Sequence, residues 1–205
     1  MQDNYAVMAD QARQLFLSYD QENIISRFGL KADDDHIYFS FLGRAMAIER
    51  SSGAVIDARS LARQGFNISL TVYDMFCHSL DSAVMPEISG EWQSLSSMGV
   101  HGAGKLSSGM LTDSELAAFS GKTEALKKAC EDLGGIEKPG GGDVSYLLPL
   151  FDFMYVWLKF YDADDEFLPS VTIMWDRNIL AFMHYETLYY AFGEILSVLK
   201  KLCGL

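Results

Sequence analysis

The feature that most constrains the fold is a pair of apolar, aromatic segments separated by a short acidic one. A strand over residues 150–161 would present mainly aromatic side chains on one face and mainly aliphatic ones on the other, which is typical of a strand inside a sheet. Residues 170–175 are rich in β-branched and aromatic side chains and predict the returning strand. Between them, Asp162–Glu166 contains four carboxylates in five residues and predicts a solvated turn.

The rest of the chain alternates between the periodicities of helices and strands. Apolar residues recur at spacings of three and four over residues 4–19, which predicts a helix, and Asp20 and Gly29 are suited to begin and end a shorter one. We predict an α+β fold, with a mostly antiparallel sheet of about five strands and helices packed on it. The remaining predicted helices cover residues 67–84, 112–133 and 179–201, and the remaining strands cover residues 36–42, 45–49 and 54–57.

The length of 205 residues suits one domain. Residues 89–109 are rich in Gly and Ser and predict a long loop with one helical turn. The Pro139–Gly142 connection is the candidate boundary, but neither side of it shows a complete two-layer pattern. We therefore predict a single domain, residues 1–205.

The composition argues against several classes of partner. Acidic residues outnumber basic ones by 28 to 16, for a net charge of -12, and such a surface repels nucleic acid and anionic membranes. The three cysteines, Cys77, Cys130 and Cys203, are far apart in the sequence and predict reduced thiols rather than a disulfide framework or a zinc knuckle. The first residues lack the basic start of a signal peptide, so we expect a cytoplasmic protein.

One glycine-rich segment, residues 99–107, partly matches a phosphate-binding loop. Gly99, Gly104 and Lys105 fit the register, whereas Leu106 stands where the motif requires Ser or Thr, so a flexible surface loop is the favoured interpretation. The sequence contains no nucleophile elbow, zinc-protease pair or dinucleotide fingerprint. It therefore leaves open whether the protein is an enzyme, and it names no cofactor.

Two groups of polar residues have the chemistry of a site. Asp74, His78 and Asp81 share one side of the predicted helix over residues 67–84 and could hold zinc or manganese. A solvated helix face is the favoured interpretation, and we nominate no metal site there. The acidic turn could supply an acid–base pair or bind a hard cation, and its favoured interpretation is the charged end of an apolar hairpin.

A succession of short motifs resembles a known family. The motifs, in chain order, are Gly90-Glu91-Trp92, Leu133-Gly134-Gly135, Gly142-Asp143, Asp165 to Pro169, and Glu186. From about Asp57 to the C-terminus, this order resembles an uncharacterised family of anaerobic bacteria and archaea, catalogued as domain of unknown function 3786. The resemblance implies an anaerobic setting, and it supplies no established catalytic residues.

These features favour a cytoplasmic accessory domain that binds a small molecule or a protein partner, with a homodimer as one form of partner. The alternative is a carboxylate-based, metal-dependent enzyme that uses the acidic turn at residues 162–166. Near the start of the last predicted helix, His184 and Glu186 diverge on either side of Tyr185, so we do not expect them to pair with each other. The residues nominated for binding are Glu91, Trp92, Asp143, Asp164, Asp165, Glu166, His184 and Glu186.

Overall fold

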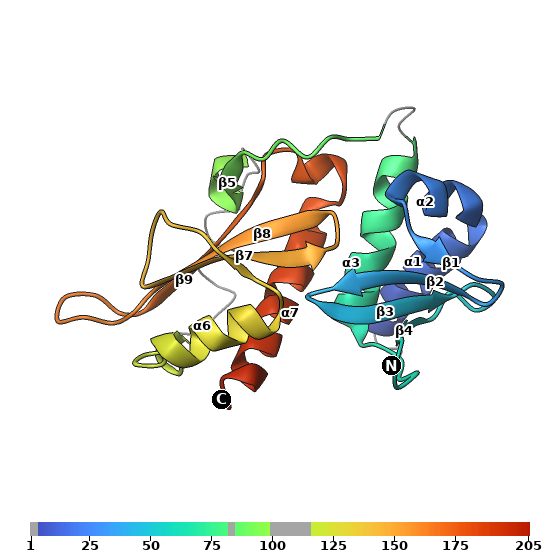
Figure 1. Cartoon of the computed structure of the whole chain (residues 1–205). Helices are drawn as coiled ribbons and strands as arrows, with labels where there is room; N and C mark the ends of the chain where they lie inside the picture. Colours follow the sequence, from blue (N-terminus) through green and yellow to red (C-terminus); the bar gives the residue numbers. More distant parts are fainter. Residues whose placement is uncertain (1–3, 82–84, 99–115) are drawn as a thin grey trace. The chain divides into compact units, whose positions relative to one another are not determined.

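The computed structural model describes residues 4–81, 85–98 and 116–205 (Figure 1). The chain divides into two compact units, each built from two stretches of sequence. Unit 1 comprises Met1–Glu87 and Asn178–Glu194, and unit 2 comprises Ile88–Arg177 and Ile195–Leu205. The glycine-rich segment at residues 99–107 lies outside the described residues. The single-domain prediction stays a prediction.

Unit 1 contains a meander of four antiparallel strands together with helices (Figure 1). Strands β1, β2, β3 and β4 pair in chain order, which confirms the predicted meander. The elements of the unit are α1 (Asn4–Ser18), α2 (Gln21–Phe28), β1 (Lys31–Ala32), β2 (His36–Phe41), β3 (Arg44–Glu49), β4 (Val55–Asp57), α3 (Phe66–Cys77), the 3-10 helices η1 (His78–Asp81) and η3 (Ile179–Ala181), and the first part of α7 (Tyr185–Leu202).

The ends of α2 form as the sequence predicts. The Asp20 side chain accepts a hydrogen bond from the Glu22 backbone N–H at 3.0 Å, which satisfies one of the donors that the start of a helix leaves free. Gly29 ends the helix with a φ of 61°, a left-handed conformation that glycine adopts without steric cost.

Helix α1 is seated against the turn between β3 and β4. Phe16 is fully buried, and the Arg13 guanidinium donates to the Ser52 carbonyl at 2.6 Å. Gly53 allows the close approach, because a Cβ at that position would lie 3.1 Å from side-chain atoms of both Arg13 and Leu17. These contacts fix α1 as one wall of the site described below.

Unit 2 is also built on antiparallel strands, paired in the order β6, β7, β8, β9, β5. Helix α6 packs against β7. The elements of the unit are β5 (Trp92–Ser94), the 3-10 helix η2 (Leu95–Met98), α6 (Thr123–Asp132), β6 (Ile136–Glu137), β7 (Val144–Phe151), β8 (Met154–Tyr161), β9 (Ser170–Asp176) and the remainder of α7.

Two details of the strand prediction are wrong, although the α+β class is confirmed. The described residues contain nine strands rather than about five, because the short strands β1, β5 and β6 carry no alternation of their own. The predicted strand over residues 150–161 is a hairpin, in which β7 ends at Phe151, Asp152 and Phe153 turn, and β8 begins at Met154. An apolar run hides such a turn, since both strands that it joins are apolar.

Among the residues that the structure places, no helix combines the length and the apolar content needed to cross a membrane.

Gly142, two residues before β7, occupies a position that has no room for a side chain. Its φ is 87°, and a Cβ there would lie 2.4 Å from the Phe160 carbonyl oxygen, whereas Gly121, with a φ of 68°, has nothing within 4 Å. Gly121→Ala should lower the free energy of unfolding by about 1–2 kcal/mol, the cost of the left-handed backbone. Gly142→Ala should lower it by at least about 3 kcal/mol, because the backbone must also shift.

Urea unfolding followed by tryptophan fluorescence measures both effects, since Trp92, Trp157 and Trp175 all belong to unit 2. Equal losses for the two variants would contradict the predicted clash.

Candidate functional site

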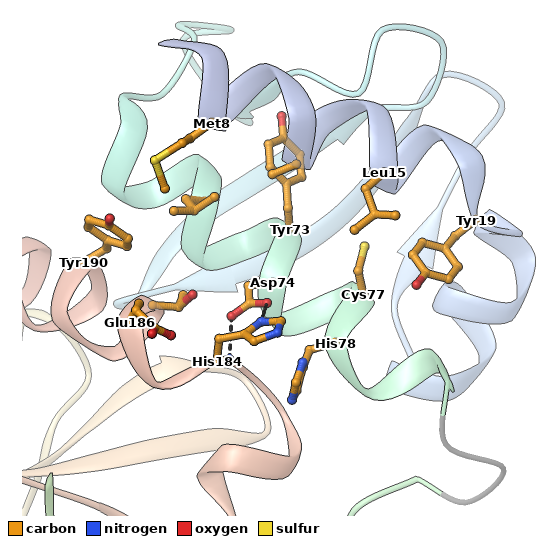
Figure 2. Close-up of a pocket in the computed structure, with 13 residues that line it drawn as sticks. Met8, Leu15, Tyr19, Tyr73, Asp74, Cys77, His78, His184, Glu186 and Tyr190 are labelled. Atoms are coloured by element: carbon orange, nitrogen blue, oxygen red, sulfur yellow. Dashed lines mark hydrogen bonds and ion pairs between the residues drawn. The ribbon is translucent and has the colours of Figure 1, made fainter. Parts of the chain in front are cut away.

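Unit 1 contains a pocket of about 720 Å³ between α1, α3 and the start of α7 (Figure 2). Most of its wall is apolar or aromatic, and the charged and imidazole side chains come from α3, η1 and the start of α7. The lining residues are Met8, Ala12, Leu15, Tyr19, Leu70, Tyr73, Asp74, Cys77, His78, His184, Glu186, Thr187 and Tyr190.

The apolar stripe of α1 forms one wall. Met8, Ala12 and Leu15 follow one another at spacings of four and three, so they lie on one side of α1. Tyr19, directly after the end of the helix, also lines this wall. Met8 and Leu15 remain 41% and 51% exposed, although a stripe of this kind is usually buried in a core. Their apolar surface is therefore available to a ligand.

Tyr73 forms a second, fixed part of the wall. Its hydroxyl donates to the Gly53 carbonyl at 2.6 Å, and its ring packs on Phe16 with the centroids 5.9 Å apart. Burial raises the pKa of the Tyr73 phenol to about 12. The side chain is therefore neutral and held in place, with its ring toward the pocket (Figure 2).

The polar end of the pocket is organised by one carboxylate. Asp74 Oδ2 accepts the His184 backbone N–H at 2.7 Å, and Oδ1 lies 2.7 Å from His184 Nδ1. Since a carboxylate only accepts, we assign the proton to Nδ1, which leaves the Nε2 lone pair of the neutral ring free. The Asp74 side chain is 12% exposed and the His184 side chain 63%, so a partly exposed imidazole is held by a nearly buried acid.

His78 stands beside this pair. Its Nε2 lies 3.1 Å from the Leu180 carbonyl oxygen, which also only accepts, so the lone pair of the neutral ring is on Nδ1. The rings of His78 and His184 lie side by side, with centroids 4.1 Å apart and planes tilted by 60° (Figure 2). The imidazoles of His78 and His184 therefore lie together beside the Asp74 carboxylate, and Glu186 adds a second carboxylate to the polar end.

Cys77 lines the pocket without the properties of a nucleophile. It is 4% exposed, and burial, together with the negative charge of Asp74, raises the pKa of its thiol to about 12. Because the thiolate is the reactive form, Cys77 acts as a small apolar wall residue at neutral pH.

The family described as Domain of unknown function (DUF3786) matches residues 20–197. The chain belongs to this family. The expected resemblance is thus confirmed, and the match begins earlier in the chain than expected. No curated protein and no solved structure matches the chain. The DUF3786 match contains Asp74, His78 and His184, whereas α1 precedes it.

Two of the residues that the sequence nominated for binding lie at this pocket. His184 immediately precedes α7 and Glu186 stands in its first turn, and both line the pocket. As expected from their spacing, no hydrogen bond joins them within the described residues. His184 instead pairs with Asp74, which is 110 positions away in the sequence.

The other residues nominated for binding belong to unit 2. Glu91 forms an exposed ion pair with Arg177 at 2.5 Å, and Trp92 packs edge-on against Trp157 with the centroids 6.2 Å apart. Asp143 accepts the Asp162 backbone N–H at 2.7 Å. Each of these contacts ties together segments of unit 2.

The acidic turn uses part of its charge locally. Asp164 accepts the backbone N–H groups of Glu166 and Phe167 at 2.9 and 2.7 Å, and Asp162 accepts that of Gly121 at 2.9 Å. Asp165 and Glu166 are exposed. These bonds show how the turn is shaped, and its proposed role in catalysis or cation binding stays a prediction.

The sequence pattern brought together two of the three groups at the polar end. It placed Asp74 and His78 on one helix face, because residues four apart are neighbours there, although a solvated face was the favoured interpretation. The third residue of that group was Asp81, whose side chain lies outside what the structure describes. The actual neighbour, His184, carries no local signal of the pairing, since only the tertiary fold brings it to α3.

The tautomer of His184 is the first test of this geometry. In the wild type, ring ¹⁵N chemical shifts should show the proton of neutral His184 on Nδ1. Asp74→Ala should release the ring to the Nε2-protonated form, because the acceptor that selects Nδ1 is lost. Asp33→Ala, which removes a carboxylate 3.8 Å from His36, is the matched control and should leave His184 unchanged. A wild-type His184 protonated on Nε2 would contradict the assigned hydrogen bond.

Thiol reactivity tests the description of Cys77. The pKa values of Cys77 and Cys130 are both raised to about 12 by burial, so at pH 8 about 1 in 10,000 of these thiols is ionised. Cys203 is only partly buried and should be alkylated first by iodoacetamide, as mapped by peptide mass spectrometry. Faster alkylation of Cys77 than of Cys203 would show that Cys77 is activated.

Proposed function

We propose that this protein binds a small organic molecule in the pocket of unit 1. The observation that carries the proposal is an apolar pocket of about 720 Å³ whose charged and imidazole groups come from α3, η1 and the start of α7. Ligand sites of proteins are commonly about 300–1,000 Å³, mainly apolar, with a few convergent polar groups. The proposal narrows the accessory-domain prediction to a small molecule; a protein partner, a homodimer, a cytoplasmic location and an anaerobic host stay predictions.

The pocket orients its ligand. An apolar or aromatic body would lie against Met8, Leu15 and the rings of Tyr73 and Tyr190, where it removes exposed apolar surface from water. A polar head would reach Asp74 and His184, since an unpaired head group among the apolar side chains would lose its hydrogen bonds. This orientation follows from the lining alone and requires no rearrangement of the fold.

The charge of the polar end selects among head groups. Asp74 and Glu186 are carboxylates, and neither Lys nor Arg is among the described residues that line the pocket. Without a bound ion, this end therefore favours an ammonium or hydroxyl head over a carboxylate head, which the two acids repel.

A matched set of fragments tests the proposal. Phenethylamine, 2-phenylethanol and phenylacetate share a phenyl body and differ in the head group, which is cationic, neutral or anionic. The protein is first treated with a chelator to remove adventitious metal. Saturation-transfer difference NMR should detect the amine and the alcohol with dissociation constants of about 1 mM or below, an affinity that efficient ligands of this size reach. Phenylacetate should bind more weakly.

Filling the pocket should abolish this binding. Ala12→Phe places a ring on the wall that α1 provides, whereas Gln11→Phe adds the same ring at the exposed neighbouring position, outside the lining. The first variant should lose fragment binding and the second should keep it, with unchanged circular dichroism in both. Fragments that bind none of the proteins, or that bind Ala12→Phe as well as the wild type, would overturn the proposal.

A further inference from the structure

We propose that Asp74, His78 and His184 together bind one divalent transition-metal ion at the polar end of the pocket. Each residue offers one donor atom, and the three atoms lie within 4.8 Å of one another. Asp74 lies on α3, His78 begins η1, and His184 directly precedes α7. This inference goes beyond small-molecule binding and does not depend on it.

The donor set selects the class of ion. Two imidazole nitrogens and one carboxylate oxygen suit Zn²⁺ and its neighbours in the first transition row, whereas Mg²⁺ and Ca²⁺ prefer sites built from oxygen. Three protein ligands are the number found at zinc sites that keep a coordination position open for water or substrate. Since these residues line the pocket, the open position would face it.

Supporting hydrogen bonds are already formed around two of the three ligands. His78 is oriented by the bond from Nε2 to the Leu180 carbonyl at 3.1 Å, which leaves Nδ1 as its ligand atom. Asp74 is held through Oδ2 by the His184 backbone N–H at 2.7 Å, which leaves Oδ1. Partners of this kind fix the orientation of ligating histidines and carboxylates at metal sites.

The third ligand is the histidine with the most freedom to adjust. His184 is 63% exposed, and its Nδ1 shares a proton with Asp74 Oδ1 across 2.7 Å. When the ion binds, it takes the place of this proton, the ring regains a proton from solvent on Nε2 and so stays neutral, and both Nδ1 and Oδ1 become ligands. Bonds of about 2.0–2.1 Å to a tetrahedral ion separate two ligand atoms by about 3.3 Å, so Nδ1 and Oδ1 must part by only about 0.6 Å.

The remaining movement is small as well. Donor atoms that now lie within 4.8 Å of one another must approach to about 3.3 Å, and the rings of His78 and His184 already lie next to each other (Figure 2). Because the His184 side chain is 63% exposed, its ring has room to turn toward the ion.

A bound divalent ion would cancel the charge of the polar end, because its two positive charges balance the carboxylates of Asp74 and Glu186. The preferred head group would then change from ammonium to carboxylate, because the ion attracts a negatively charged donor to its open position. This consequence rests on the proposed function, whereas binding of the ion itself does not, so the experiment below uses the metal alone.

Isothermal titration of the metal-free full chain with Zn²⁺ tests the site. We expect one ion per chain, and little binding of Mg²⁺ under the same conditions. Asp74→Asn, His78→Gln and His184→Gln should each weaken Zn²⁺ binding by more than the 10- to 100-fold that loss of a supporting partner typically causes. Circular dichroism and urea unfolding of each variant verify that the fold is kept.

Three controls address the other places where zinc could bind. His36→Gln removes a histidine outside the site, the double variant Asp165→Asn/Glu166→Gln removes the free charges of the acidic turn, and Cys77→Ser removes the nearby thiol. All three should bind Zn²⁺ as the wild type does. In addition, the absorption spectrum of the Co²⁺-loaded wild type should show a site of nitrogen and oxygen ligands without a thiolate charge-transfer band.

Two outcomes would overturn the inference. One is Zn²⁺ binding that is unchanged in all three ligand variants. The other is binding that is lost in the acidic-turn variant or in Cys77→Ser, which would place the ion elsewhere. The Co²⁺ spectrum of the wild type keeps the inference testable even where a ligand variant fails to fold.

Discussion

The structure of the site depends on one carboxylate with two bonds. Asp74 accepts both the backbone N–H and the Nδ1–H of His184, and so fixes the residue before α7 and the orientation of its imidazole at the same time. A carboxylate that is only 12% exposed is stable when its oxygens are hydrogen-bonded, because an unpaired buried charge is costly. One of these bonds, from His184 Nδ1 to Oδ1, also sets the tautomer of His184. Stability and chemistry are therefore coupled at Asp74, and a substitution there acts on both.

The walls of the pocket are held by contacts that lie outside it. The hydroxyl of Tyr73 is hydrogen-bonded to Gly53, Arg13 is hydrogen-bonded to Ser52, and Phe16 of α1 packs on the ring of Tyr73. The ring of Tyr190 is placed by an edge-on contact with Phe66 at 5.0 Å. Because these contacts hold α1 and the two tyrosines in place, the exposed surfaces of Met8 and Leu15 do not have to pack in the core, which leaves them free to contact a ligand.

Much of the fold could be predicted because its signals are local. The cap at Asp20, the left-handed glycine at residue 29 and the periodicity of α1 each act within a few residues. Gly134 and Gly135 end α6 in the same local way: their N–H groups return to the carbonyls of Glu131 and Cys130, and Gly134 has a φ of 77°. By contrast, the Asp152–Phe153 turn was missed because it lies between two apolar strands.

The site was harder to predict for a related reason. Asp74 and His78 could be placed on one face of a helix from their spacing, but the pairing with His184 spans 110 positions and depends on how α7 begins. The acidic turn drew attention because its charges are adjacent in sequence, and two of its carboxylates are engaged with neighbouring backbone N–H groups. Density of charge along a sequence is thus a poor guide to a site, since solvated turns produce it as readily.

The pocket is lined by residues inside the part of the chain that matches the family and by residues that precede it. The DUF3786 match begins at residue 20, so it includes Asp74, His78 and His184, while the apolar wall from α1 precedes it. Under the proposed function, the polar end determines which head group is held and α1 determines which apolar body fits beside it. Specificity for the body then depends on Met8, Ala12 and Leu15 of α1 and on Tyr19 directly after it, together with the rings of Tyr73 and Tyr190. Changes in α1 can alter the shape of the accepted ligand without touching the hydrogen bonds on which Asp74 and the start of α7 depend.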